Sequence, residues 1–162
     1  MKKIKEKFTI VERLIFLFMF ILLVIIAIPI IKDKIEKPKR DKAEQDTDKY
    51  IEIVNSDLKG IKETDINLYN ELLKYNSFNK YCSITDSEKQ VLKCGEIEIE
   101  ISSVEIKPEI DSVIYFSSDG VVSGYKIIVD NYKVIYPNSK ELKTIKRYRK
   151  PKEKEQVELK SS

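Results

Sequence analysis

The residues best suited to covalent chemistry are two cysteines, Cys82 and Cys94, in a chain of 162 residues without histidine. Two thiols predict one disulfide in an oxidising compartment, with two unpaired thiols as the alternative. A bridge at this spacing closes a short loop and stabilises the fold by about 3 kcal/mol in the chain-entropy model. Two sulfurs without a histidine do not complete a usual structural zinc site. We therefore expect a structural bridge here and no metal.

No other residues form a pattern typical of catalysis. The absence of histidine removes the commonest general base, and the sequence contains no nucleophile motif or phosphate-binding loop. Three glutamates alternate with isoleucines in residues 96–101, which suggests either a calcium site or the solvated face of a strand. The solvated face is the preferred interpretation. We expect no catalytic residue, no cofactor and no enzymatic activity.

The charges do not indicate a nucleic-acid-binding protein. The chain carries 30 basic and 27 acidic residues, for a net charge of +3. The basic excess lies close to the two ends of the chain, in residues 2–7 and 146–150. A nucleic-acid-binding domain would gather its basic residues on one folded face.

One segment, residues 14–31, is apolar throughout and reads LIFLFMFILLVIIAIPII. At ~1.5 Å per residue a helix of this length extends about 27 Å, close to the ~30 Å hydrocarbon core of a bilayer. A cleaved signal peptide has a shorter apolar region followed by small residues, and a small soluble domain rarely buries so uniform a helix. The segment therefore predicts a single transmembrane helix.

The orientation of this helix does not follow from the flanking charges, because Lys and Arg lie on both sides of it. The leader is very short, and both cysteines lie beyond the helix. These two features favour a cytoplasmic N-terminus and an extracytoplasmic C-terminal part in a bacterial cell membrane.

The residues that enter the helix are Phe8-Thr9-Ile10-Val11-Glu12, followed by the apolar run. This stretch resembles the N-terminus of type IV pilins and of the pseudopilins of type II secretion and competence systems. If Phe8 is the first mature residue, Glu12 lies at the fifth position, where the family has its glutamate. Pro29 then lies at the twenty-second position, where pilins have a helix-bending proline.

The resemblance implies a role in assembly for both residues. A glutamate beside an apolar helix is costly to bury without a partner, so Glu12 is expected to pair with a positive group on a neighbouring subunit. The alternative is a local pair with Arg13 or a nearby lysine. Pro29 removes one helix hydrogen bond and is expected to kink or locally melt the helix. Its alternative is a proline tolerated near the end of the membrane-spanning segment.

The position before Phe8 departs from the family. Prepilin leaders end in glycine, or sometimes alanine, whereas this chain has Lys7. The resemblance thus makes Lys7 and Phe8 the processing site but leaves two outcomes: an uncleaved leader or atypical processing. The implied partners are other pilins or pseudopilins, an assembly platform protein, a prepilin peptidase and membrane lipid.

Beyond the membrane the sequence predicts an α+β domain, in which the long N-terminal helix packs its amphipathic second half on a small antiparallel sheet of three or four strands. An apolar stripe at helical spacing begins at Ile51 and continues towards Leu73, with a turn near Asp65. Strands are expected at 96–101, 112–116, 121–129 and 132–136, and the cysteines are expected to bracket the passage from helix to first strand. The expected parts are a leader (1–7), a transmembrane helix (8–31), a charged stalk or helix continuation (32–48), the α+β domain (49–137) and a charged, disordered tail (138–162).

The function expected from these features is that of a minor pilin or pseudopilin-like component, which assembles through its helix and presents a small domain at the surface. The machine would be a type IV pilus, a competence system or a type II secretion-like system. The alternative is a single-pass scaffold subunit of an envelope or division complex. Sustained heptads would favour the scaffold, and the apolar stripe does not maintain them past Asp65.

Overall fold

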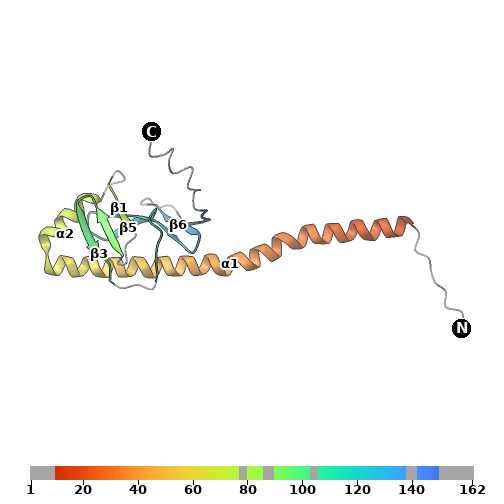
Figure 1. Cartoon of the computed structure of the whole chain (residues 1–162), viewed down its shortest axis with the longest axis horizontal. Helices are drawn as coiled ribbons and strands as arrows, with labels where there is room; N and C mark the ends of the chain where they lie inside the picture. The colour runs from red at the N-terminus through yellow and green to blue at the C-terminus, as the bar shows by residue number, and fades with distance from the viewer. Residues whose placement is uncertain (1–9, 77–79, 86–89, 103–105, 138–141, 150–162) are drawn as a thin grey trace. The chain divides into compact units, whose positions relative to one another are not determined.

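The computed structural model describes residues 10–76, 80–85, 90–102, 106–137 and 142–149. These residues form one long helix, a second short helix and an antiparallel sheet of seven strands (Figure 1). The predicted α+β class is therefore confirmed, although the sheet has more strands than the three or four expected.

The long helix α1 spans Ile10–Thr64 and belongs to both compact units of the chain, Met1–Lys39 and Arg40–Ser162. Two prolines, Pro29 and Pro38, lie inside it without interrupting the helix. The local melting expected at Pro29 is therefore not observed. The charged stretch 32–48 has two alternative predictions, a stalk or a continuation of the helix. It continues the helix.

Asp65 separates α1 from the next helix. Its Oδ1 accepts hydrogen bonds from the backbone N–H groups of Asn67 (3.1 Å) and Leu68 (3.0 Å). A side-chain oxygen in this position satisfies N–H groups that have no partner in the first turn of a helix. The helix α2 (Ile66–Leu72) and the 3-10 turn η1 (Leu73–Tyr75) follow. The predicted turn is confirmed, and Asp65 is the residue that caps the helix after it.

The sheet is antiparallel between all neighbouring strands, in the order β3-β2-β1-β4-β5-β6-β7. Its strands are β1 (Cys82–Thr85), β2 (Val91–Cys94), β3 (Ile97–Glu100), β4 (Val113–Phe116), β5 (Val122–Val129), β6 (Tyr132–Tyr136) and β7 (Thr144–Arg147).

The hairpin between β5 and β6 forms as the sequence predicts. Asp130 and Asn131 both have positive φ, 49° and 63°. Two consecutive residues of this kind make the tight turn whose twist matches that of the flanking strands. Val129 pairs with Tyr132 directly across the turn.

Three strands were not expected, and two expectations are wrong as a result. Cys82–Thr85 and Val91–Cys94 pair with each other as the antiparallel strands β1 and β2, so the cysteines do not bracket a passage from helix to first strand. The stretch beyond residue 137 contributes β7 and is not disordered over Thr144–Arg147. Both errors have one cause: β1, β2 and β7 have four residues each and lack the strict alternation of isoleucine and glutamate that identifies β3, a strand of the same length. Pairing with a neighbouring strand, here β6, defines β7.

The core lies between one face of the sheet and the part of α1 beyond Lys39 (Figure 1). Tyr50, Val54 and Leu58 supply the helix side, each at most 3% exposed. The packed part of α1 already begins at Ala43, before the domain boundary expected at residue 49. The strands contribute the other half of the core: Cys82, Ile84, Leu92, Cys94, Ile99, Ile114, Phe116, Tyr125, Ile127 and Val134.

Candidate functional site

The apolar segment of α1, residues 14–31, is exposed along its whole length. Its large apolar side chains are 40–65% exposed. By length and composition, α1 is the one helix in the described part of the chain that can cross a membrane. An apolar surface of this size needs an apolar environment, which a bilayer or a bundle of similar helices provides.

Glu12 and Pro29 lie on this same helix, near the two ends of the apolar segment. At ~1.5 Å per residue they are about 26 Å apart along the axis. Glu12 is exposed. Lys7 and Phe8 lie outside the described residues, so the geometry of the expected processing site is not part of the structure.

The cysteines form the predicted disulfide. Their Cα atoms are 4.3 Å apart, and they occupy facing positions that continue the β1–β2 pairing beyond Ser83 and Lys93. A Cα separation of about 4.5 Å is typical of antiparallel residues that do not exchange backbone hydrogen bonds. Both cysteines are 0% exposed. The bridge thus fastens one hairpin from within the core.

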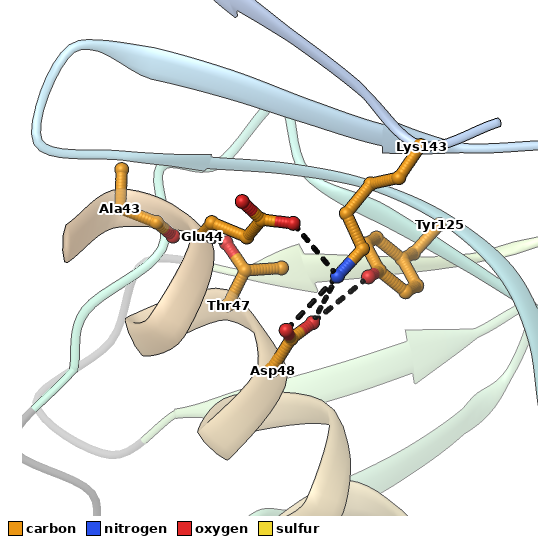
Figure 2. A network of polar contacts seen from close by, with 6 residues as sticks. All are labelled: Ala43, Glu44, Thr47, Asp48, Tyr125 and Lys143. Carbon is orange, nitrogen blue, oxygen red and sulfur yellow. Dashed lines mark hydrogen bonds and ion pairs between the residues drawn. The ribbon is translucent and has the colours of Figure 1, made fainter. Parts of the chain in front are cut away.

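A group of polar side chains, which we term the Lys143 clamp, ties α1 to the residue before β7 (Figure 2). The Lys143 ammonium donates to both carboxylate oxygens of Asp48, at 2.7 and 2.9 Å, and lies 3.3 Å from Glu44. The Tyr125 hydroxyl on β5 donates to Asp48 at 3.2 Å. One turn of α1 therefore holds β5 and the residue before β7 through charge-assisted hydrogen bonds.

Burial and neighbouring charged groups both shift the pKa values of the clamp residues. Partial burial is the largest single effect on Lys143 and favours its neutral form, but the hydrogen bonds to Asp48 and Glu44 and the charge of Asp48 together outweigh burial and raise the pKa of the ammonium above its usual value. Burial raises the pKa of the Tyr125 hydroxyl to about 12, against an ordinary value of 10.0. At neutral pH the clamp therefore contains a charged lysine and a neutral phenol.

This shift predicts a loss of stability at alkaline pH. The pKa of Tyr125 is higher in the folded state than in the unfolded state. The contribution of Tyr125 to the free energy of unfolding is therefore complete below pH 10 and is lost as the pH rises towards about 12. We expect Tyr125→Phe to lose less stability over this window than the wild type, since phenylalanine cannot ionise. Urea unfolding of the detergent-solubilised full chain at pH 9 and pH 11.5 measures the difference. Equal losses in both proteins would show that Tyr125 does not titrate in this way.

Other polar residues of α1 also hold distant loops. Asp57 accepts hydrogen bonds from the backbone N–H and the hydroxyl of Ser102, at 2.8 and 2.7 Å. Asn55 accepts from the Val122 backbone N–H at 2.9 Å. The sequence analysis missed these contacts and the clamp, because the partners lie 45 to 99 residues apart and no local pattern connects them.

The described residues contain no group of three or more metal-ligating side chains. A surface pocket of about 370 Å³ combines opposite charges that pair with each other, since Lys42 lies 3.3 Å from Asp130 and 3.9 Å from Asp46. The pocket is lined by Lys42, Asp46, Ile106, Lys107, Val129 and Asp130.

Comparisons with protein-family models, with curated proteins and with solved structures give no match to this chain. The functional interpretation therefore rests on the geometry of the chain itself. A long helix with an apolar N-terminal part, followed by an antiparallel sheet packed on the later part of the helix, is the general arrangement of pilin-like proteins.

Proposed function

We propose that this protein is a membrane-anchored assembly subunit, a minor pilin or pseudopilin-like component of a bacterial type IV pilus, competence or type II secretion-like machine. The observation that carries the proposal is the register of Glu12 and Pro29 on one exposed apolar helix. The role is assembly and surface presentation rather than catalysis.

The energetics of Glu12 support an intersubunit contact. A carboxylate next to apolar side chains on a membrane helix is stabilised by a positive partner or hydrogen-bond donors at the same depth. When helices associate in a bundle, such a pair forms only at one axial offset. Glu12 therefore sets the stagger between neighbouring helices, and the apolar residues 14–31 supply the packing surface around it.

The disulfide supports the proposed topology. Bridges persist in oxidising compartments and are rare in the cytosol. The domain that contains Cys82 and Cys94 then lies outside the cytoplasm, and the basic leader lies inside. Lys7 makes this subunit one whose leader is retained or removed in an unusual way. The mass of the membrane-extracted protein distinguishes the two, because an intact Met1 start rules out cleavage between Lys7 and Phe8.

We expect Glu12→Ala to lower recruitment into the filament or complex by about tenfold. Polar contacts between membrane helices contribute about 1–2 kcal/mol, which corresponds to this factor. The measurement is the amount of tagged protein that copurifies with the assembled complex, normalised to its amount in the membrane.

Glu52→Ala, an exposed glutamate farther along the same helix, is the matched control and is expected to behave as the wild type. If Glu12→Ala is recruited as well as this control, the intersubunit role of Glu12 is wrong. A single-pass scaffold subunit then becomes the better description.

A further inference from the structure

The two outer strands of the sheet carry charges of opposite sign. At one edge, Glu96, Glu98 and Glu100 are exposed on or beside β3, and we term this the acidic edge. At the other edge, β7 and the residues after it expose basic side chains, and we term this the basic edge: Lys146, Arg147 and Arg149. Among the described residues no further strand pairs with either edge.

The acidic edge presents its backbone groups at Glu98 and Glu100. The Ile101 N–H donates to the Gln90 carbonyl at 2.8 Å, which makes this facing pair a hydrogen-bonded one. In an antiparallel ladder such pairs alternate, so Ile97 and Ile99 also bond to β2. The N–H and C=O groups of Glu98 and Glu100 therefore point away from the sheet.

The basic edge presents its backbone groups at Ile145 and Arg147. The Tyr148 N–H donates to the Asn131 carbonyl at 2.6 Å, in register with the β6–β7 pairing. By the same alternation, Thr144 and Lys146 bond to β6. The groups of Ile145 and Arg147 point outwards.

The charged side chains Glu98 and Lys146 have opposite signs and lie on the same face of the sheet. Ile99 and Ile145 both pack on the core that contains α1, so Glu98 and Lys146, one position away, lie on the opposite face of the sheet. All six strand pairs are antiparallel, so β3 and β7 run in the same direction. Two copies with the same orientation thus bring these strands together in parallel.

We propose that the acidic edge of one copy of this chain pairs with the basic edge of the next copy, as a parallel β3–β7 ladder with Glu98 opposite Lys146. In this register the Glu98 N–H donates to the carbonyl of Ile145, and its C=O accepts from the N–H of Arg147. Both bonds use groups that already point outwards. The isoleucines of β3 then continue the apolar face next to Ile145.

Charge selects this pairing over the alternatives. Two acidic edges or two basic edges repel each other, whereas unlike edges attract, so the contact is head-to-tail and leaves a free edge at each end. Within one copy Lys133 and Lys146 face each other directly across β6 and β7, an arrangement that is unfavourable without a nearby anion. A glutamate of the next copy supplies that anion.

Glu98 also has a partner within its own copy, since it lies 3.1 Å from Lys93 on β2. Its side chain remains 60% exposed, and it points to the solvated face, where Lys146 of the next copy would lie. Charged residues on edge strands usually prevent pairing. Here the opposite signs restrict pairing to one combination of edges.

The contact rests on the proposed assembly role, because that role brings copies with the same orientation together in one membrane. The test uses the full chain in membranes with Glu96→Cys and Thr144→Cys, which face each other in the proposed register. Within one copy these positions lie on opposite edges, about 29 Å apart at ~4.8 Å per strand. A short bismaleimide therefore joins them only between copies.

We expect the double-cysteine protein to give a ladder of dimers, trimers and larger species on denaturing gels. The proteins with only Glu96→Cys or only Thr144→Cys are the matched controls and are expected to give no species beyond a weak dimer. The native cysteines do not react, because they are bonded and 0% exposed. Their continued resistance to maleimide also shows that each variant is folded.

Charge reversal tests the register. In the double-cysteine protein, Glu98→Lys and Lys146→Glu are each expected to reduce the amount of cross-linked oligomers about fivefold. The combination of both substitutions is expected to restore that amount. Lys146→Gln, which removes the charge without reversing it, gives an intermediate reduction. A ladder that is absent, that appears equally in the single-cysteine controls, or that does not respond to the charge changes overturns the proposal.

The two proposals fail separately. If Glu12→Ala leaves recruitment unchanged but the ladder still forms, the helix contact is wrong and the edge contact stands. If Glu12→Ala abolishes recruitment but the double-cysteine protein that keeps Glu12 forms no cross-linked oligomers, the assembly role stands and the edge contact is wrong.

Discussion

Replacing both Cys82 and Cys94 with alanine is expected to lower the free energy of unfolding by about 3 kcal/mol. The bridge closes a loop with a sequence separation of 12, and its removal restores conformational freedom to the unfolded chain. Both positions are fully buried in the core, so the smaller side chains also leave unfilled space. Thermal unfolding of the detergent-solubilised full chain measures the effect, with an expected decrease in Tm of about 10–20 °C.

The matched control is treatment of the native wild type with a mild reductant. Because the sulfurs are shielded, the folded protein is expected to resist reduction and to keep its Tm. A double-alanine protein whose unfolding free energy lies within about 0.5 kcal/mol of the wild type would contradict a stabilising role for the bridge.

Leu22→Arg combined with Ile25→Arg is expected to remove the protein from the membrane. An arginine near the centre of a membrane helix costs about 2.5–3.5 kcal/mol on insertion scales, so two cost about 6 kcal/mol. Both positions lie within the exposed apolar segment, and neither is in the core of the domain. Extraction of membranes at alkaline pH, followed by immunoblotting of the pellet and the supernatant, measures the loss.

Leu22→Ala combined with Ile25→Ala alters the same two positions and keeps the segment apolar, so this control is expected to stay in the membrane pellet. Retention of the double-arginine protein in that pellet would show that another part of the chain holds the protein at the membrane.

The sequence predicts the features that depend on a repeated or local pattern of residues. The apolar block of α1 needs no structural context, and the stripe through Val54 and Leu58 identifies the face that covers the sheet. The turn at Asp130 and Asn131 is a short local signal, and β6 forms where the sequence predicts it. In each case neighbouring residues contain the information.

The remaining features depend on contacts that form only after folding. The strand β7 has a single isoleucine among polar residues and exists because β6 lies beside it. Two cysteines alone make the disulfide predictable, but the hairpin that brings them together is not visible in their spacing. The Lys143 clamp joins residues 95 positions apart, and Lys143 cannot be distinguished from its basic neighbours in the sequence.

The charged residues of α1 illustrate the same limit. A stretch rich in both charges is usually a solvated stalk, and residues 32–48 fit that pattern. The structure instead assigns Asp48 to the clamp, and farther along the helix Asp57 caps the loop at Ser102. The second part of α1 therefore positions the sheet through polar contacts as well as through its apolar stripe.

The most direct test of the proposed assembly subunit is photo-cross-linking from the apolar helix in the membranes of its native cell. A benzophenone amino acid at Ile15 lies on the same side of α1 as Glu12. We predict cross-links to another chain that has an apolar N-terminal helix, with a yield that Glu12→Ala lowers about tenfold. Cross-links to lipid alone, or an unchanged yield in Glu12→Ala, would contradict the proposed assembly role.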